Sequence, residues 1–172
     1  LYWGTSEWTA EQLQEAYDVC ERLQLEKPQM EQPQYHMFCR DRVETELAGH
    51  IEKHGLGTTT WSPLASGVLT GKYNDGIPEG SRLASEQWSW LQELVLDDDK
   101  INKVRSLTGV AAELDCSMAQ LALAWTAKHP HVSTVIMGAS RVSQLEENLG
   151  ALEVMERLDE SAMARINGIL NS

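Results

Sequence analysis

Apolar positions along the chain follow two different periods, and their succession predicts an α/β protein. Short apolar or β-branched runs predict strands at about 1–5, 29–36, 56–61 and 132–138. Between and after these runs, apolar residues recur every three or four positions, which is typical of amphipathic helices. Strands that alternate with such helices favour a parallel sheet joined by right-handed crossovers.

Helix starts are marked by short polar signals. In a capping box, a Ser or Thr side chain and a Glu or Gln three residues later satisfy each other's backbone amides. Three segments carry this pattern, and they begin at Thr9, Ser117 and Ser143. Asp41 and Asp159 are expected to cap two further helices.

Four strand–helix units are compatible with two architectures. One is a small doubly wound sheet, and the other is half of an eight-stranded barrel. A complete barrel takes about 250 residues, whereas this chain has 172. We expect one domain over 1–172, with a long loop at about 66–97 and a C-terminal helix at about 159–171.

Composition excludes several classes of protein. The formal net charge is −12, which argues against a general affinity for nucleic acid or for an anionic membrane. No apolar run reaches the ~18 residues of a membrane span, and we see no signal peptide. Three cysteines without a C-x-x-C pair fit reduced thiols and a cytoplasmic location.

Candidate chemistry is concentrated where the third strand ends. The strand finishes at Trp61, breaks at Pro63, and leads into a loop that contains Gly67, Gly71 and Lys72. An aromatic ring, backbone amides and a nearby cation suit a planar ring joined to phosphates. A tryptophan in the core is the alternative for Trp61, and the residues alone leave both open.

A second candidate lies after the fourth strand. Gly138, Ala139 and Ser140 precede a helix whose N-terminal amides suit an anion, with Arg141 beside them. An ordinary strand-to-helix turn is the alternative reading, and it also stays open at this point.

Other motifs are rejected. His50 and His54 stand four residues apart, but the glutamate between them is one place late for a zincin, so a solvated helix face is preferred. The segment from Gly67 to Lys72 has the wrong spacing for a nucleoside triphosphate loop. No G-x-G-x-x-G or G-x-S-x-G motif occurs, and we expect no metal site.

Several short motifs together resemble one family. They stand in one order along essentially the whole chain: Trp3-Gly4-Thr5-Ser6, Glu31-Gln32-Pro33-Gln34-Tyr35-His36, Trp61-Ser62-Pro63-Leu64-Ala65-Ser66-Gly67, Gly71-Lys72-Tyr73 and Gly138-Ala139-Ser140 with Gln144-Leu145-Glu146-Glu147-Asn148. This set resembles the aldo-keto reductases, and most closely the branch of the voltage-gated potassium channel beta subunits with their bacterial and plant relatives. The resemblance implies the C-terminal half of a (β/α)8 barrel, with strands five to eight.

The resemblance also implies an NADP(H) site at the ends of these strands. Trp61 would stack on the nicotinamide, while Ser6 and Gln32 hold its carboxamide. Ser62, Leu64 and Ser66 would present backbone and hydroxyl donors near the pyrophosphate, and the same loop would contact the cofactor through Pro63 and Ala65. Lys72 would meet the pyrophosphate charge, and Arg82 the 2′-phosphate. The adenosine contacts would come from Gly138, Ser140, Gln144, Glu147 and Asn148.

Some expected features are absent or altered. The family's catalytic Asp, Tyr, Lys and His lie on the first four strands, so we assign no catalytic residue here. Tyr35 and His36 belong to the sixth-strand motif instead. Glu7 stands where the channel subunits have Arg, and this change removes a cation near the cofactor. Likewise Ser66 replaces a Cys, and Gly80 replaces an aromatic residue.

Three functional hypotheses follow. The first is a partial aldo-keto reductase with little or no reductase activity by itself. The second is a non-catalytic module that associates with itself or with a missing N-terminal half through its open sheet edges. The third is a regulatory subunit of an ion channel that senses the cofactor.

Overall fold

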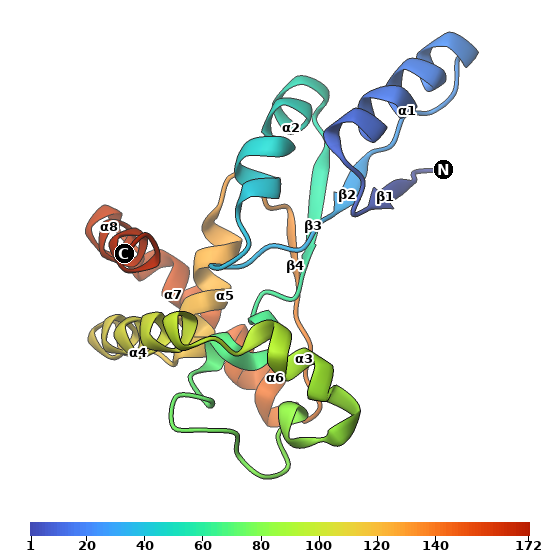
Figure 1. Cartoon of the computed structure of the whole chain (residues 1–172). Coiled ribbons are helices and arrows are strands. Elements are labelled where there is room, and N and C mark those ends of the chain that lie inside the picture. The colour runs from blue at the N-terminus through green and yellow to red at the C-terminus, as the bar shows by residue number, and fades with distance from the viewer. The chain divides into compact units, whose positions relative to one another are not determined.

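A parallel four-stranded sheet with flanking helices forms the protein (Figure 1). A computed structural model describes all 172 residues. The strands are β1 (Gly4–Ser6), β2 (Met30–Gln32), β3 (Gly57–Trp61) and β4 (Thr134–Ile136). The α-helices are α1 (Ala10–Leu23), α2 (Ala48–His54), α3 (Ser89–Val95), α4 (Asp98–Glu113), α5 (Met118–Lys128), α6 (Val142–Leu149), α7 (Ala151–Arg157) and α8 (Glu160–Leu170). The predicted fold class, α/β with four parallel strands, is confirmed.

Shorter helical segments lie between these elements. A π-helical turn, η1 (Arg42–Glu46), precedes α2. Three 3₁₀ segments occupy the loop after β3, and they are η2 (Ala65–Thr70), η3 (Arg82–Ala84) and η4 (Glu86–Trp88). The long loop predicted at 66–97 is therefore a run of short helical pieces that ends in α3.

The chain divides into two compact units, which we describe separately. The first consists of Leu1–Pro63 and Thr126–Met137, and it contains the whole sheet. The second consists of Leu64–Trp125 and Gly138–Ser172. The expectation of one domain over 1–172 stays a prediction.

The sheet of the first unit runs in the order β1-β2-β3-β4. Its two faces differ in burial. Thr5, Glu31 and Thr58 lie opposite one another in register, and all are buried. Leu56 shares this side of β3 because side chains alternate along a strand, and it packs with Leu13 of α1. The helices therefore cover this face.

The opposite face of the sheet is more open. Ser6 and Gln32 are paired in register there, and Trp61 lies on the same side of β3. Their side chains are half-buried or exposed. Met30 covers Gly4, where a Cβ atom would stand 2.4 Å from the Met30 carbonyl oxygen. A glycine is needed at this position for close packing of the two strands.

Buried polar groups on the helix-covered face all have partners. The Glu31 carboxylate accepts hydrogen bonds from the Thr5 hydroxyl and from the Trp8 backbone N–H, the latter at 3.0 Å. The hydroxyl of Thr60 donates to the Thr134 carbonyl across the β3–β4 pair. These bonds allow polar side chains inside a packed layer.

A polar network connects the segment after β2 with η1. The buried Tyr35 hydroxyl donates to Glu44 Oε1 at 2.7 Å, and Arg40 holds the same carboxylate with two bonds of 2.9 Å each. Burial alone would raise the pKa of Glu44, but the hydrogen bonds from Arg40 and Tyr35 outweigh it and lower that pKa. Burial also raises the pKa of the Tyr35 phenol.

In the second unit, α4 packs lengthwise against α8. Val104 and Leu107 on α4 and Ile166 on α8 are completely buried. The segment of α5 that belongs to this unit is buried on nearly all sides, from Met118 to Trp125. An apolar helix without a polar face is typical of the centre of a packed unit.

Helix caps agree with the sequence in three places. Thr9 and Gln12 form a complete capping box, and Ser117 and Gln120 exchange the same pair of bonds. Asp159 accepts from the Ala162 backbone N–H, as a cap should. These caps are confirmed because they need only a few consecutive residues.

Two other cap predictions are wrong. Asp41 has helical backbone angles and its side chain caps nothing, because the π-turn η1 begins directly after it. Ser143 lies inside α6, whose N-cap is Arg141, so no capping box forms there. The helical stretch after Ser143 is divided at Gly150 into α6 and α7, and Leu149 and Leu152 on either side of this break are exposed.

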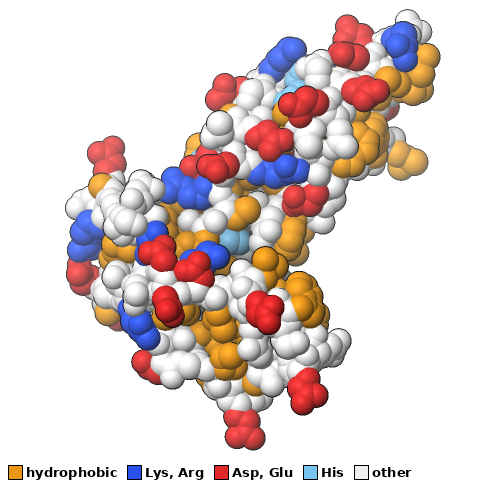
Figure 2. All heavy atoms as spheres, viewed as in Figure 1, with side chains coloured by type: hydrophobic (Ala, Val, Ile, Leu, Met, Phe, Trp, Pro, Cys, Tyr) orange, Lys and Arg blue, Asp and Glu red, His pale blue; other side chains and the backbone are white.

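Charged side chains of both signs are scattered over the face shown in Figure 2. No helix of this protein is long and apolar enough to cross a lipid bilayer. The three cysteines are free thiols, and Cys20 is buried on α1.

Candidate functional site

Three neighbouring strands of the first unit end on the same side of the sheet, at the C-terminal ends of its strands. Because β1, β2 and β3 are parallel, their last residues Ser6, Gln32 and Trp61 all lie at this C-terminal end. The Ser6 hydroxyl donates to the Gln32 backbone carbonyl at 3.0 Å. Thus the three residues that the resemblance assigns to the nicotinamide all belong to the open face at this C-terminal end.

The backbone of Trp61 is fixed on both sides. Its N–H donates to the Pro33 carbonyl at 3.1 Å, and its carbonyl accepts from the Tyr35 N–H at 3.3 Å. On the other side of β3, Trp61 is paired in register with Ile136 of β4. The Trp61 side chain is half-buried, so part of the indole remains accessible from solvent.

Glu7 adds a carboxylate at this C-terminal end. Glu7 Oε1 accepts from Trp61 Nε1 at 2.8 Å and from the Gln34 backbone N–H at 2.6 Å. The second oxygen lies 3.5 Å from Arg42 Nε, and the Glu7 carbonyl accepts from the same guanidinium at 2.7 Å. In the sequence, Glu7 is visible only as a changed charge, because no local pattern connects it with Trp61.

The chain after Trp61 has an unusual backbone. Ser62, Ala65 and Ser66 have positive φ angles of 56°, 47° and 57°, although none of them is glycine. Such angles cost free energy for residues with a Cβ atom, and they concentrate at ligand-binding sites. Pro63 is buried. The strained run therefore coincides with the loop predicted to hold the pyrophosphate.

In the second unit, Lys72 folds back onto this loop. A Cβ atom built on Gly67, whose φ is +96°, would stand only 2.9 Å from Lys72 Cε and Nζ. The ammonium group also lies 5.0 Å from the centre of the Tyr73 ring. Gly67 thus supplies both a left-handed backbone and the space for the lysine. This requirement was not visible in the sequence.

Arg82 is found elsewhere in the same unit. Its guanidinium stacks over the Trp88 ring at 4.3 Å from the centroid, and the side chain is exposed. The indole therefore covers one side of the guanidinium, while the rest of the exposed side chain remains open to solvent. An anion such as a phosphate could be bound from that open side.

The loop before α6 brings together Ser140 and Gln144. Gln144 Oε1 accepts from the Ser140 N–H at 2.9 Å and lies 3.1 Å from its hydroxyl. Asn148 follows one turn later on the same helix and is buried, whereas Glu147 and Gly138 are exposed. The residues assigned to adenosine are therefore spread over one loop and one helix, in close contact only for Ser140 and Gln144.

Histidines form no metal site. No group of three or more His, Cys, Asp or Glu side chains is arranged to hold a metal ion. His50 and His54 instead stack with Tyr17, with the His54 ring 4.1 Å from that of Tyr17. Burial and the neighbouring Lys53 lower the pKa of His54. His36 is buried and accepts from the Phe38 N–H.

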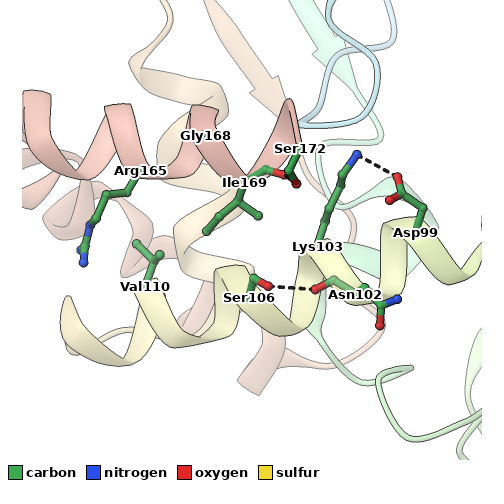
Figure 3. A pocket seen from close by; sticks show the side chains of 9 residues that line it. All are labelled: Asp99, Asn102, Lys103, Ser106, Val110, Arg165, Gly168, Ile169 and Ser172. Atoms are coloured by element: carbon green, nitrogen blue, oxygen red, sulfur yellow. Dashed lines mark hydrogen bonds and ion pairs between the residues drawn. The ribbon is translucent and has the colours of Figure 1, made fainter.

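A separate groove lies between α4 and α8 in the second unit (Figure 3). It has a volume of about 550 Å³ and contains two cations, Lys103 and Arg165. Each cation is already paired with a carboxylate, Lys103 with Asp99 at 2.7 Å and Arg165 with Glu113. The groove therefore offers no free charge to a ligand, and we assign it no function.

Comparison with known proteins places this chain among the reductases. The model of the Aldo/keto reductase family matches residues 1–171, so the chain belongs to the aldo/keto reductase family. A probable voltage-gated potassium channel subunit beta of Arabidopsis thaliana is 50% identical over 173 aligned positions, which cover 100% of this chain and 53% of the relative.

Two further relatives carry similar names. A probable voltage-gated potassium channel subunit beta of Oryza sativa subsp. japonica is 49% identical, with 100% of this chain and 53% of the relative covered. A putative one from Schizosaccharomyces pombe is 44% identical, with 99% and 50% covered. The chain therefore spans about half the length of the curated relatives that it matches.

Proposed function

We propose that this chain carries the NADP(H)-binding half of an aldo-keto reductase barrel. One observation carries the proposal: the residues expected at the nicotinamide, Ser6, Gln32 and Trp61, are the C-terminal residues of three adjacent parallel strands. In parallel α/β folds, ligands bind at this end of the strands. The half-accessible indole offers a flat face for a nicotinamide ring, and the Gln32 amide can pair with a carboxamide.

Features of the loop after β3 support the phosphate part of the proposal. Positive φ angles at Ala65 and Ser66 follow Leu64, whose φ is −101°. A right-handed residue followed by left-handed ones turns successive N–H groups to one side, and such concave backbone binds anions. Lys72, packed on Gly67, places a positive charge at this loop. Arg82 is the proposed partner of the 2′-phosphate.

We further propose that the chain alone has little or no reductase activity. The family's reaction transfers hydride from NADPH to an aldehyde or ketone, with a tyrosine as proton donor. Tyr35 is completely buried, and its hydroxyl is bonded to Glu44. A buried phenol with a raised pKa is a poor donor to a substrate at the C-terminal end of the strands. We therefore propose that this half binds the cofactor but does not supply the proton donor of the reaction.

Cofactor titration tests the main proposal. NADPH fluorescence would be followed as protein is added, for the natural chain and for Trp61→Leu. Loss of a base-stacking aromatic should weaken binding by at least about tenfold. Trp90→Leu is the matched control, because Trp90 is exposed on α3 and should leave the affinity unchanged. Equal affinities of the natural chain and Trp61→Leu would refute the proposal.

Two additional measurements test its finer parts. Arg82→Ala should weaken NADPH but leave NADH unaffected, since only NADPH has a 2′-phosphate. Mixing the chain with NADPH and 4-nitrobenzaldehyde should cause almost no loss of cofactor absorbance. Clear turnover that disappears in Trp61→Leu would show that the chain is an active reductase.

A non-catalytic assembly module is the second candidate. The sheet ends in two unpaired edges, β1 and β4, and large apolar side chains beside them are exposed: Leu1, Tyr2, Trp3 and Ile136. Exposed strand edges of this kind favour pairing with another chain, either a second copy or an N-terminal half. The relatives are named as beta subunits of a voltage-gated potassium channel, which adds such a channel as a candidate partner. Light scattering that finds only a folded monomer would count against self-pairing.

A further inference from the structure

We propose that Glu7 is a positioning residue that fixes the plane of the Trp61 indole through its N–H. The inference deepens the proposed function, because that indole is the proposed nicotinamide platform. It starts from one contact: Trp61 Nε1 donates to Glu7 Oε1 at 2.8 Å across 54 residues of sequence. The indole N–H is the only hydrogen-bond donor of a tryptophan side chain.

Glu7 can hold the ring because its own carboxylate is held. The same Oε1 accepts from the Gln34 N–H at 2.6 Å, so a backbone amide fixes the position of the acceptor. The other oxygen is paired with Arg42 Nε at 3.5 Å, and the Arg42 guanidinium also donates to the Glu7 carbonyl at 2.7 Å. Arg42 is anchored in turn by Glu46 at 3.1 Å.

Without this bond, little else would set the orientation of the ring. The Trp61 backbone is fixed by strand pairing, but the side chain stands on the open face of the sheet and is only half-buried. Packing alone usually fixes side chains in a core, whereas this ring is only half-buried. A hydrogen bond to an anchored carboxylate selects one rotamer and therefore one ring plane.

The strained backbone of Glu7 supports the inference that its contacts hold the carboxylate in one place. Its φ is +60°, a region that residues with a Cβ atom adopt at a cost of roughly 1–2 kcal/mol. Such strain persists where surrounding contacts determine it. Here the contacts are those of Arg42, Gln34 and Trp61 to Glu7, which together place the carboxylate beside the indole.

The first test uses the indole proton and needs no cofactor. Nuclear magnetic resonance of the ¹⁵N-labelled chain would follow hydrogen exchange at Trp61 Nε1. Glu7→Ala should speed that exchange by at least about threefold, because the bonded acceptor is lost. Glu7→Gln keeps an oxygen acceptor and should retain most of the protection. Unchanged exchange in Glu7→Ala would overturn the proposal.

The second test is a double-mutant cycle on NADPH binding. With Trp61 present, Glu7→Ala should weaken binding about five- to tenfold, which lies within the net contribution of one ordinary hydrogen bond. In a Trp61→Phe background, which retains an aromatic plane but no N–H, the same change should have an effect below about twofold. Equal effects in both backgrounds would show that Glu7 acts without the indole, and would overturn the proposal.

The two tests separate this inference from the proposed function. A chain that binds no NADPH, yet shows Glu7-dependent protection of the Trp61 proton, refutes the cofactor role and confirms the positioning. A chain that binds NADPH through Trp61 without any coupling to Glu7 confirms the cofactor role and refutes the positioning role of Glu7. Circular dichroism of each variant checks that it is folded.

Discussion

A substitution at Glu44 tests how much the hydrogen-bonded carboxylate of this residue contributes to the free energy of unfolding. The perturbation is Glu44→Gln, which preserves shape and removes the charge. The carboxylate accepts two bonds of 2.9 Å from Arg40 and one of 2.7 Å from Tyr35. The Arg40 and Glu44 side chains are 27% and 22% exposed, so solvent screens this pair less than a fully exposed one.

The expected loss in the free energy of unfolding for Glu44→Gln lies between two limits. Hydrogen bonds to charged groups contribute about 1.5–3 kcal/mol each when buried, whereas exposed ion pairs contribute about 0.2–1 kcal/mol. Glutamine keeps one acceptor oxygen, so we expect a loss of about 2 kcal/mol at pH 7. For a chain of this size, that loss lowers Tm by roughly 4–8 °C.

The cost should depend on pH with a definite sign. The pKa of Glu44 is lower in the folded than in the unfolded chain. Its contribution is therefore fully present above the unfolded value of about 4.3, and it is lost as the pH falls through the folded pKa. The difference between natural chain and Glu44→Gln should thus shrink toward zero in acid.

Urea unfolding followed by circular dichroism at several pH values measures this difference. Glu15→Gln is the control, because Glu15 is exposed on α1 and its loss changes the net charge by the same amount. A cost for Glu44→Gln that equals the Glu15 control at pH 7, or that persists undiminished in strong acid, would refute the reasoning.

Two further predictions concern backbone geometry, and thermal unfolding measures both. Gly67→Ala should cost about 1–2 kcal/mol, because its φ is +96°, a backbone conformation that residues with a Cβ atom adopt only with strain; Gly109→Ala, in open space on α4, should instead stabilise by about 0.5–1 kcal/mol. Thr9→Ala should cost about 1 kcal/mol as a lost N-cap, whereas Ser143→Ala should be nearly neutral because Ser143 lies inside α6. A loss of stability in Ser143→Ala equal to that in Thr9→Ala would instead favour a capping box at Ser143.

Local signals explain most of what the sequence predicted correctly. The caps at Thr9, Ser117 and Asp159 need only three or four consecutive residues, so neighbouring elements hardly affect them. The strands were predicted too long at 29–36 and 132–138, because β2 and β4 are paired over only three residues each. Propensity marks a segment that can be extended, but partners decide how much of it is paired.

Local signals failed where the packed structure overrode them. Asp41 precedes residues with a good helical pattern, yet the chain forms a π-turn in which Leu47 N–H bonds to the Arg42 carbonyl at 2.8 Å. Val43 and Leu47 are still completely buried. The apolar residues of this segment are therefore buried, although the element that carries them differs from the helix expected after Asp41.

The sequence by itself determined the α/β class, the parallel direction of the strands, three helix caps and, through its motifs, the family. All of these depend on residue types at short spacing. Only the tertiary structure decided that Glu7 meets Trp61, that Tyr35 is bonded to Glu44, and that Lys72 lies beside Gly67. These contacts join residues from different elements or turns, so they exist only when strand register and loop geometry bring the side chains together.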